Sequence, residues 1–300
     1  MTDRPWAPEH PVDEALARAL VGEQFPELAS LPVTRLGEGW DMDVWGFGGL
    51  AFRFPRRQIA VPLVTREISA LAWLGPRLPV AIPRPLHIGK PSPAFPYAFY
   101  GHRLIPGTTA DRLALSTEGR ARLAAPLGRF LRALHSLDPV ESEAHGLLFQ
   151  PEFASPERQQ ARALPRLASL AGTPLEAPVR EALSVLPPPN DEPHHVAHGD
   201  LYSRHVVVDH GELSGIIDWG DVRRGDRAPD LALIATFLPP EARAAFFEAY
   251  GAISPELWAR ARFYGLCRYG LALHVYALDL GDGGLAAEAR RGLENALAQS

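Results

Sequence analysis

The stretch that decides the fold runs from residue 198 to residue 221 and reads HGDLYSRHVVVDHGELSGIIDWGD. Two short apolar runs, Val206 to Val208 and Leu213 to Ile217, flank the turn residues 209–211. Short β-branched runs on either side of a glycine-containing turn are typical of a β-hairpin. We therefore predict two antiparallel strands, with a polar loop before the first and an acidic segment after the second.

The ends of this hairpin are expected to bring three polar residues together. Residues just before the first strand and just after the second lie at the same end of an antiparallel pair, so Asp200 and His205 should face Asp218. Such a cluster can orient a nucleophile and hold a divalent cation. Phosphoryl transfer needs both, because metal ions neutralise the polyphosphate and a carboxylate orients the attacking oxygen.

The spacing in this stretch resembles that of a known family. His-Gly-Asp, a metal-ligand position five residues after the aspartate, and a hairpin ending in Ile-Asp-Trp are together similar to the catalytic core of the aminoglycoside phosphotransferase superfamily of kinase-like enzymes. Either piece alone is more often a turn or a buried strand with a polar end. The resemblance implies that Asp200 is the catalytic base, that His205 occupies the first metal-ligand position, and that Asp218 is the acidic metal ligand.

The resemblance also implies a fold and cofactors. The expected fold class is α+β, a two-lobed protein-kinase-like fold with a small antiparallel-sheet N-terminal lobe (1–105) and a mostly helical C-terminal lobe (106–300). The expected cofactors are Mg²⁺ and, as phosphoryl donor, ATP or GTP. The chain departs from the usual pattern of the superfamily at His205. Most of the superfamily carries asparagine at this position, whereas the macrolide phosphotransferase branch also has histidine.

Residues before the catalytic stretch predict the small sheet. The runs at 32–36, 42–45 and 50–54 are typical of three consecutive antiparallel strands. The first two are joined by a predicted loop in which Gly37 and Gly39 can let backbone N–H groups approach nucleotide phosphates. An ordinary hairpin turn is the alternative for this loop.

A basic residue lies in the middle of the third predicted strand. Arg53 stands between two phenylalanines, and the helix predicted over 65–74 carries Glu67 at the edge of its apolar face. By the resemblance, these two residues form the ion pair that contacts nucleotide phosphates in kinases. The alternative is a solvated arginine and a surface glutamate.

Two further features bear on the nucleotide. Arg56 and Arg57 follow the third strand, and either can replace Arg53 as the phosphate contact. The run from residue 97 to residue 105 is typical of an apolar strand, and by the resemblance it leads into a hinge between the lobes. The main chain of Arg103 and Ile105 is expected there to contact the nucleobase edge.

The second lobe is expected to be helical. Apolar residues recur at three- and four-residue steps over 117–137, which predicts one long central helix. Asp230 is expected to cap a helix, and by the resemblance it has a supporting role. The charged segment 139–193 either walls the acceptor site or forms a solvated helical pair. The other predicted helices lie near 241–250, 256–278 and 285–298.

Composition limits the binding partners and the cellular compartment that we expect for this protein. The chain has 300 residues, 46% of them hydrophobic, and a formal net charge of −5, which argues against nucleic acid as a partner. It has a single cysteine, Cys267, and neither a bilayer-length apolar stretch nor a basic start followed by an apolar run. We therefore expect a protein of the reducing cytoplasm, with no membrane partner and no secretory signal.

The acceptor is expected to be a hydroxylated small molecule. Residues 255–300 carry five acidic side chains and five arginines, whereas a pocket for a polycationic aminoglycoside favours a surplus of carboxylates. This balance places a macrolide ahead of an aminoglycoside as the antibiotic acceptor. Two alternatives remain: a metabolite kinase for an amino alcohol or sugar, and a catalytically inactive, nucleotide-binding relative.

Overall fold

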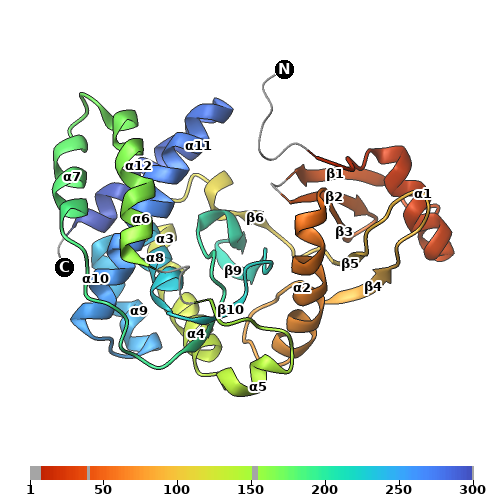
Figure 1. Ribbon diagram of the computed structural model, residues 1–300, viewed down its shortest axis with the longest axis horizontal. Helices are drawn as coiled ribbons and strands as arrows, with labels where there is room; N and C mark the ends of the chain where they lie inside the picture. Colours follow the sequence, from red (N-terminus) through yellow and green to blue (C-terminus); the bar gives the residue numbers. More distant parts are fainter. Residues whose placement is uncertain (1–7, 39–40, 151–154, 299–300) are drawn as a thin grey trace. The chain divides into compact units, whose positions relative to one another are not determined.

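The computed structural model of the chain (Figure 1) describes residues 8–38, 41–150 and 155–298. It divides into two compact units, of which unit 1 comprises residues 1–76 and 82–105, and unit 2 comprises residues 77–81 and 106–300. Residues 77–81, which the sequence placed in the first lobe, belong to unit 2 because Ala81 bridges to Gly215. Within the described ranges, no helix is both long and apolar enough to cross a membrane.

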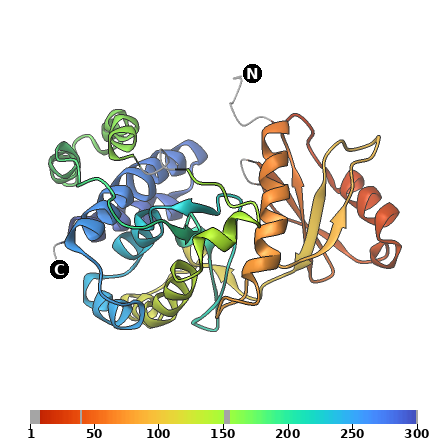
Figure 2. The ribbon, with the colours of Figure 1, turned by 60° about the horizontal axis from the view of Figure 1, so that its bottom comes forward.

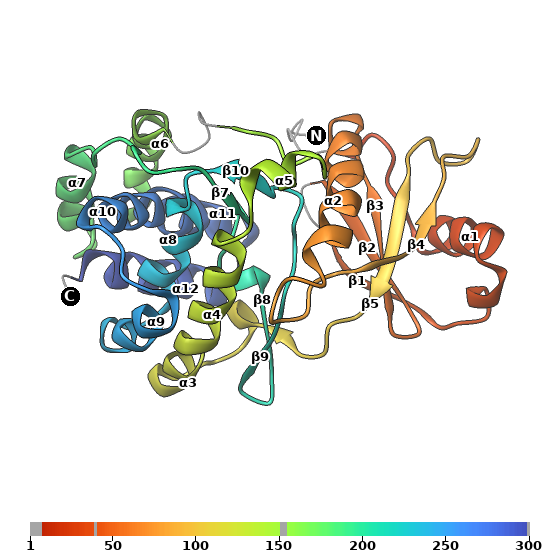
Figure 3. The ribbon, with the colours of Figure 1, turned by 90° about the horizontal axis from the view of Figure 1, so that it is seen from below.

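Unit 1 is built on one five-stranded antiparallel sheet with the strand order β1-β2-β3-β5-β4. Helices α1 and α2 lie on opposite sides of this sheet (Figures 2 and 3). The strands are β1 Val33–Glu38, β2 Met42–Phe47, β3 Leu50–Pro55, β4 Pro85–Gly89 and β5 Phe99–Arg103. The helices are α1 Glu14–Gln24 and α2 Val61–Leu74.

Alternation along β3 gives this sheet two different faces. Phe52 and Phe54 are fully buried, in one apolar cluster with Leu20 and Val21 of α1. Arg53 lies between the two phenylalanines and therefore points to the other face, toward α2. The register is strongly specified, because a slip of one residue would move the arginine into the apolar cluster.

Two boundaries in unit 1 differ from the predictions. Gly37 lies within β1 and pairs with Val44, because a bulge after Arg35 takes up an extra residue and lets the pairing continue. The predicted loop is therefore wrong at Gly37, and Gly39 lies outside the described residues. Helix α2 begins at Val61 instead of residue 65, since a proline is favourable in its first turn.

Two small sheets in unit 2 hold the stretch that decides the fold. The predicted hairpin is confirmed, because β8 Val206–Asp209 pairs antiparallel with β9 Glu212–Ile216. Strand β6 Thr108–Thr109 pairs with β8. Directly before and after the stretch, β7 His195–Ala197 pairs with β10 Arg223–Gly225, so both of its ends are tied together.

The remainder of unit 2 is helical, and all ten residues of its helix α8 are buried. The predicted single helix over 117–137 is wrong, because α3 ends at Arg122 and α4 begins at Ala124. Pro126 explains the break, since it has no N–H to donate back to the preceding turn. The predicted helix over 256–278 contains a π-helical segment, Gly265–Ala272, between α10 and α11.

The helices of unit 2 have the following bounds: α3 Thr117–Arg122, α4 Ala124–His135, α5 Pro139–Glu143, α6 Pro156–Ala163, α7 Glu176–Ser184, α8 Ala228–Phe237, α9 Arg243–Tyr250, α10 Pro255–Tyr264, α11 Leu273–Leu280 and α12 Gly283–Leu297.

Close packing of α4 on α9 (Figure 3) yields a prediction for Gly128. A Cβ added at Gly128 would lie 2.7 Å from the backbone oxygen of Phe246, so Gly128→Ala should destabilise the protein by about 1–3 kcal/mol, the usual range for overpacking. Thermal unfolding measures this change. Gly119→Ala is the matched control, because a Cβ in α3 meets nothing closer than 3.5 Å. Equal melting temperatures for the two variants would contradict the packing account.

Candidate active site

The loop before β8 is held by a carboxylate from α8. Asp230 is fully buried, and it accepts hydrogen bonds from the backbone N–H groups of His198 and Gly199, each at 2.8 Å. The Nε2 of His135, at the end of α4, lies 3.0 Å from the same carboxylate. Gly199 has a φ of 84°, and a side chain there would collide with Arg223. Segments far apart in the sequence thus meet at one carboxylate.

Asp230 does not act as the predicted helix cap. It lies in the first turn of α8, and its side chain bonds to the loop instead of to its own helix. Burial raises the pKa of this carboxyl, but His135, His198 and the N–H of Gly199 outweigh burial and hold the pKa below its usual value. Asp230 is therefore an ionised, fully buried support for the loop.

His205 links this loop to the far end of the hairpin. Its Nδ1 lies 2.6 Å from the backbone oxygen of Asp200, so this nitrogen carries a proton and donates. Its Nε2 lies 3.2 Å from Oδ2 of Asp218, which confirms that these two residues meet. Burial lowers the pKa of His205, but the carboxylates of Asp218 and Asp200 outweigh burial and raise the pKa above its usual value.

Asp218 offers the better magnesium ligand of this pair. Its side chain is 44% exposed, and Mg²⁺ prefers carboxylate oxygen to imidazole nitrogen. The ring of His205 donates from Nδ1 to a carbonyl, which leaves Nε2 as its possible ligand atom. Among the described residues, no group of three or more His, Cys, Asp or Glu is placed to hold a metal ion. A Mg²⁺ ion at this pair would need phosphate oxygens and water to complete its six ligands, and proteins usually bind this ion in that way.

The carboxylate of Asp200 has two partners that the sequence reasoning missed. The Nη2 of Arg268 lies 2.8 Å from Oδ1, and the hydroxyl of Tyr269 lies 3.3 Å from the same oxygen. Burial raises the pKa of Asp200, but Arg268 and His205 outweigh burial and lower the pKa. Asp200 is therefore ionised at neutral pH, and its side chain is 22% exposed.

Arg268 and Tyr269 both come from the π-helical segment 265–272. In the sequence analysis, the arginines of this region only balanced the charge of its acidic side chains. A helical pattern with a period of 3.6 residues cannot reveal a π-helical turn, although such turns are frequent at functional sites. The signal that could have found the pair is an arginine within the otherwise apolar run GLCRYGLA.

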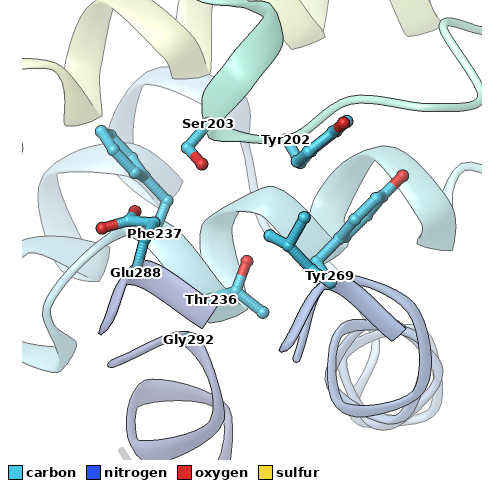
Figure 4. A pocket seen from close by; sticks show the side chains of 8 residues that line it. Tyr202, Ser203, Thr236, Phe237, Tyr269, Glu288 and Gly292 are labelled. Carbon is cyan, nitrogen blue, oxygen red and sulfur yellow. The ribbon is translucent and has the colours of Figure 1, made fainter. Parts of the chain in front are cut away.

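Two tyrosines stack beside this cluster (Figure 4). The rings of Tyr202 and Tyr269 lie 5.1 Å apart with 9° between their planes, and the rings of Tyr202 and His205 meet edge to face. A cavity of about 10 Å³ lies next to the tyrosines. It has room for roughly one water molecule, so it is too small for an acceptor.

Arg53 and Glu67 form the ion pair predicted in unit 1. The Nη2 of Arg53 lies 3.6 Å from Oε1 of Glu67, and Glu67 is fully buried. The alternative of a solvated arginine beside a surface glutamate is therefore wrong. A buried pair of this kind holds the guanidinium in one place on the α2 side of the sheet.

The two neighbouring arginines are ion-paired elsewhere within unit 1. Arg56 lies 3.7 Å from Asp43, and Arg57 contacts Asp41. These pairs do not involve Glu67, so Arg53 is retained as the predicted phosphate contact. Arg56 and Arg57 stay the alternatives.

The main-chain groups predicted to contact the nucleobase lie at the end of β5 and just after it. The backbone oxygen of Arg103 lies 2.8 Å from Nδ1 of His102 and so already accepts a hydrogen bond. Burial is the main reason that the pKa of His102 falls to about 4, so the ring is neutral. Ile105 is half-buried. The nucleotide contacts of Gly37, Arg103 and Ile105 stay predictions.

Comparison with known proteins decides the family. The model of the phosphotransferase enzyme family matches residues 32–264 of this chain. The chain belongs to this phosphotransferase family. The aminoglycoside 3′-phosphotransferase of Escherichia coli is 30% identical over 215 residues, which cover 65% of this chain and 72% of that protein. An uncharacterised Bacillus subtilis protein, YcbJ, is 31% identical over 64 residues, about a fifth of its length.

Solved structures share the fold of this phosphotransferase. The GDP and kanamycin complex of APH(2″)-IIIa aligns with a TM-score of 0.72 at 21% identity, over 93% of this chain and 97% of that chain. The macrolide 2′-phosphotransferase MphH of Brachybacterium faecium aligns with a TM-score of 0.59 at 23% identity, over 94% and 98%. These likenesses confirm the predicted kinase-like fold class.

The support that Asp230 gives the phosphotransferase loop can be tested by Asp230→Asn. The amide should lower the free energy of unfolding by about 1–3 kcal/mol near neutral pH, because its NH₂ group cannot accept a hydrogen bond and leaves a buried backbone N–H group unsatisfied. The pKa of Asp230 is depressed by folding. Its contribution is therefore full above the unfolded pKa of about 4 and is lost as the pH falls through the folded pKa.

Urea unfolding of wild type and Asp230→Asn across this acid range measures the effect. The difference in stability should shrink toward low pH. A difference that stays constant with pH would show that the carboxylate charge does not matter.

Proposed function

We propose that this phosphotransferase moves the γ-phosphoryl group of ATP or GTP to a hydroxyl group of a small-molecule acceptor, with Asp200 as the base. One observation carries the proposal: Asp200 stands on a loop held by Asp230, and its backbone oxygen is joined through His205 to Asp218. A base and a candidate metal ligand thus belong to one hydrogen-bonded unit. Phosphoryl transfer requires these two groups at a fixed separation.

Asp200 acts on the hydroxyl group of the acceptor. Its carboxylate accepts a hydrogen bond from the acceptor hydroxyl, orients the oxygen for in-line attack and takes the proton. The bond from phosphorus to the acceptor oxygen forms as the bond to the departing nucleoside diphosphate breaks. Phosphoryl transfer passes through a loose transition state, so orientation matters more than strong basicity. The low pKa of Asp200 suits this role, because the carboxylate is ionised whenever the acceptor arrives.

Asp218 and His205 would hold Mg²⁺, which neutralises phosphate charge when it is bound. Asp218 contributes an exposed carboxylate on a residue with a φ of 64°, a conformation uncommon outside glycine and frequent at functional sites. His205 contributes Nε2 once that nitrogen is unprotonated, while its Nδ1–H keeps the ring oriented on the loop.

The nucleotide-binding residues are proposed to lie in unit 1. Arg53 would contact phosphate oxygens, with the buried carboxylate of Glu67 fixing its guanidinium. Arginine presents a planar fork to phosphate where kinases present the point charge of lysine. Gly37 and Gly39 would approach the phosphates by their main chain. The main chain of Arg103 and Ile105 would contact the nucleobase.

The acceptor is proposed to be an antibiotic, with a macrolide ahead of an aminoglycoside. The histidine at position 205 and the balanced charge of residues 255–300 support the macrolide, and the identity to the Escherichia coli aminoglycoside enzyme supports the second choice. A metabolite kinase for an amino alcohol or sugar has the same catalytic groups. The inactive alternative is disfavoured because Asp200 and Asp218 are both present.

Asp200→Asn tests the base directly. The amide is nearly isosteric but cannot take a proton, so kcat should fall at least about 100-fold, whereas the Kd for the nucleotide should be unchanged. Steady-state turnover and calorimetry measure the two quantities. Asp191→Asn is the control, because Asp191 is exposed before β7. Retention of more than about a tenth of wild-type turnover would refute the base assignment.

Asp218→Ala and His205→Ala should differ in their effect on the metal–nucleotide complex. Asp218→Ala should weaken binding of Mg²⁺·ATP more, because Mg²⁺ prefers oxygen ligands and imidazole ranks second. Calorimetric titration with and without Mg²⁺ separates loss of the metal from loss of the nucleotide. Equal losses in the two variants would mean that His205 is a full ligand.

A further inference from the structure

The carboxylate of Asp200 is held by only one of its two oxygens. Oδ1 accepts hydrogen bonds from Nη2 of Arg268 at 2.8 Å and from the hydroxyl of Tyr269 at 3.3 Å. In the part of the chain that the structure describes, Oδ2 of Asp200 has no hydrogen-bond partner. The two oxygens of the proposed base are therefore not equivalent, and Oδ2 keeps its lone pairs for another donor.

Both donors to Oδ1 are fixed by their own surroundings. The guanidinium of Arg268 donates to the hydroxyl of Tyr264 and lies 5.9 Å from the ring centre of Tyr269. Tyr269 is buried and stacks on Tyr202, as Figure 4 shows. Burial, and then the charge of Asp200, raise the pKa of Tyr269 well above its usual value. The hydroxyl of Tyr269 therefore stays protonated and donates.

No other contact among the described residues orients this carboxylate. An aspartate does not fix the plane of its own carboxylate, because the last torsion of its side chain has only a broad preference. His205 donates to the backbone oxygen of Asp200 and not to its side chain. Asp218 has an exposed carboxylate near Asp200, but the like charge repels and offers no hydrogen bond. Arg268 and Tyr269 are thus the groups that set the direction of Oδ2.

We propose that Arg268 is a positioning residue of phosphoryl transfer, which with Tyr269 holds Oδ1 of Asp200 and leaves Oδ2 to take the proton of the acceptor hydroxyl. The proposal rests on the proposed role of Asp200 as the base. The hydroxyl proton moves to Oδ2, while the acceptor oxygen bonds to phosphorus and the bond to the nucleoside diphosphate breaks. Arg268 donates hydrogen bonds and keeps its proton throughout. This role is the same for charged and uncharged acceptors.

Arg268→Ala removes the shorter of the two bonds to Oδ1. With Mg²⁺·ATP, and with erythromycin and kanamycin as acceptor probes, kcat should fall by about 10- to 100-fold, because a misplaced catalytic group is costly. The KM for the acceptor and the Kd for the nucleotide should stay within about threefold, because an interaction that orients the base acts on the transition state. Tyr269→Phe removes the longer bond and should cause a smaller fall in kcat.

Chemical rescue separates positioning from a loss of stability. Guanidinium chloride at low millimolar concentration should restore part of the lost kcat of Arg268→Ala, because the free cation can donate to Oδ1 in place of the side chain. Urea has a similar planar shape without the charge and should restore much less. Arg262→Ala is the matched control, because Arg262 is also partly buried and donates to the backbone oxygens of Ala296 and Leu297. Its kcat should equal that of wild type with or without guanidinium.

A crystal structure of the variant gives a readout that needs no turnover. Without Arg268, the carboxylate of Asp200 should be rotated or adopt more than one orientation. Thermal unfolding checks that each variant is folded. Should Arg268→Ala be unfolded, Arg268→Gln keeps more of the side-chain volume and takes its place in the kinetics and in the crystal structure.

The outcomes separate this inference from the proposed function. The inference is overturned if kcat of the Arg268 variant stays within about threefold of wild type, or if the loss appears in KM instead. It is also overturned if guanidinium restores no more activity than urea, or if the carboxylate keeps its orientation without the arginine. If the carboxylate turns as expected but wild type forms no phosphoester with either probe, the positioning role stands and the proposed function fails.

Discussion

The site in unit 2 depends on a carboxylate that touches no reacting group. Asp230 takes two successive backbone N–H groups, from His198 and Gly199, into a fully buried position. Two adjacent N–H groups that point at one anion define the direction of the chain at that point. The loop is therefore held against the buried helix α8 in one orientation, and this orientation fixes where Asp200 stands.

Short contacts from this loop then position the other residues of the site. The backbone oxygen of Asp200 accepts a hydrogen bond from Nδ1–H of His205. The other ring nitrogen of His205 contacts the carboxylate of Asp218 across the end of the hairpin. The side chain of Asp200 is held separately, by Arg268 and Tyr269 of the π-helical segment. The backbone of Asp200 is thus joined to the candidate metal ligand, whereas the orientation of its carboxylate depends on a second element.

Local sequence patterns predicted much of the fold and part of the site. Contacts between residues far apart in the sequence could not be predicted from such patterns. The hairpin and the pairing of Arg53 with Glu67 follow from alternation and helical spacing, and both predictions are confirmed. Pro126 marks the break before α4, but the apolar stripe across it concealed the break. The contact of Arg268 with Asp200 spans 68 residues and arises from a π-helical turn, so no periodic pattern could reveal it.

The central claim is that this loop directs a phosphoryl group from a nucleotide to an acceptor hydroxyl. Phosphorus NMR of the wild-type chain with Mg²⁺, ATP or GTP, and a panel of macrolides, sugars and aminoglycosides tests it most directly. The account predicts a new phosphomonoester signal that grows in step with nucleoside diphosphate for at least one acceptor of the panel. Unchanged nucleotide across the whole panel, or release of inorganic phosphate alone, would contradict it.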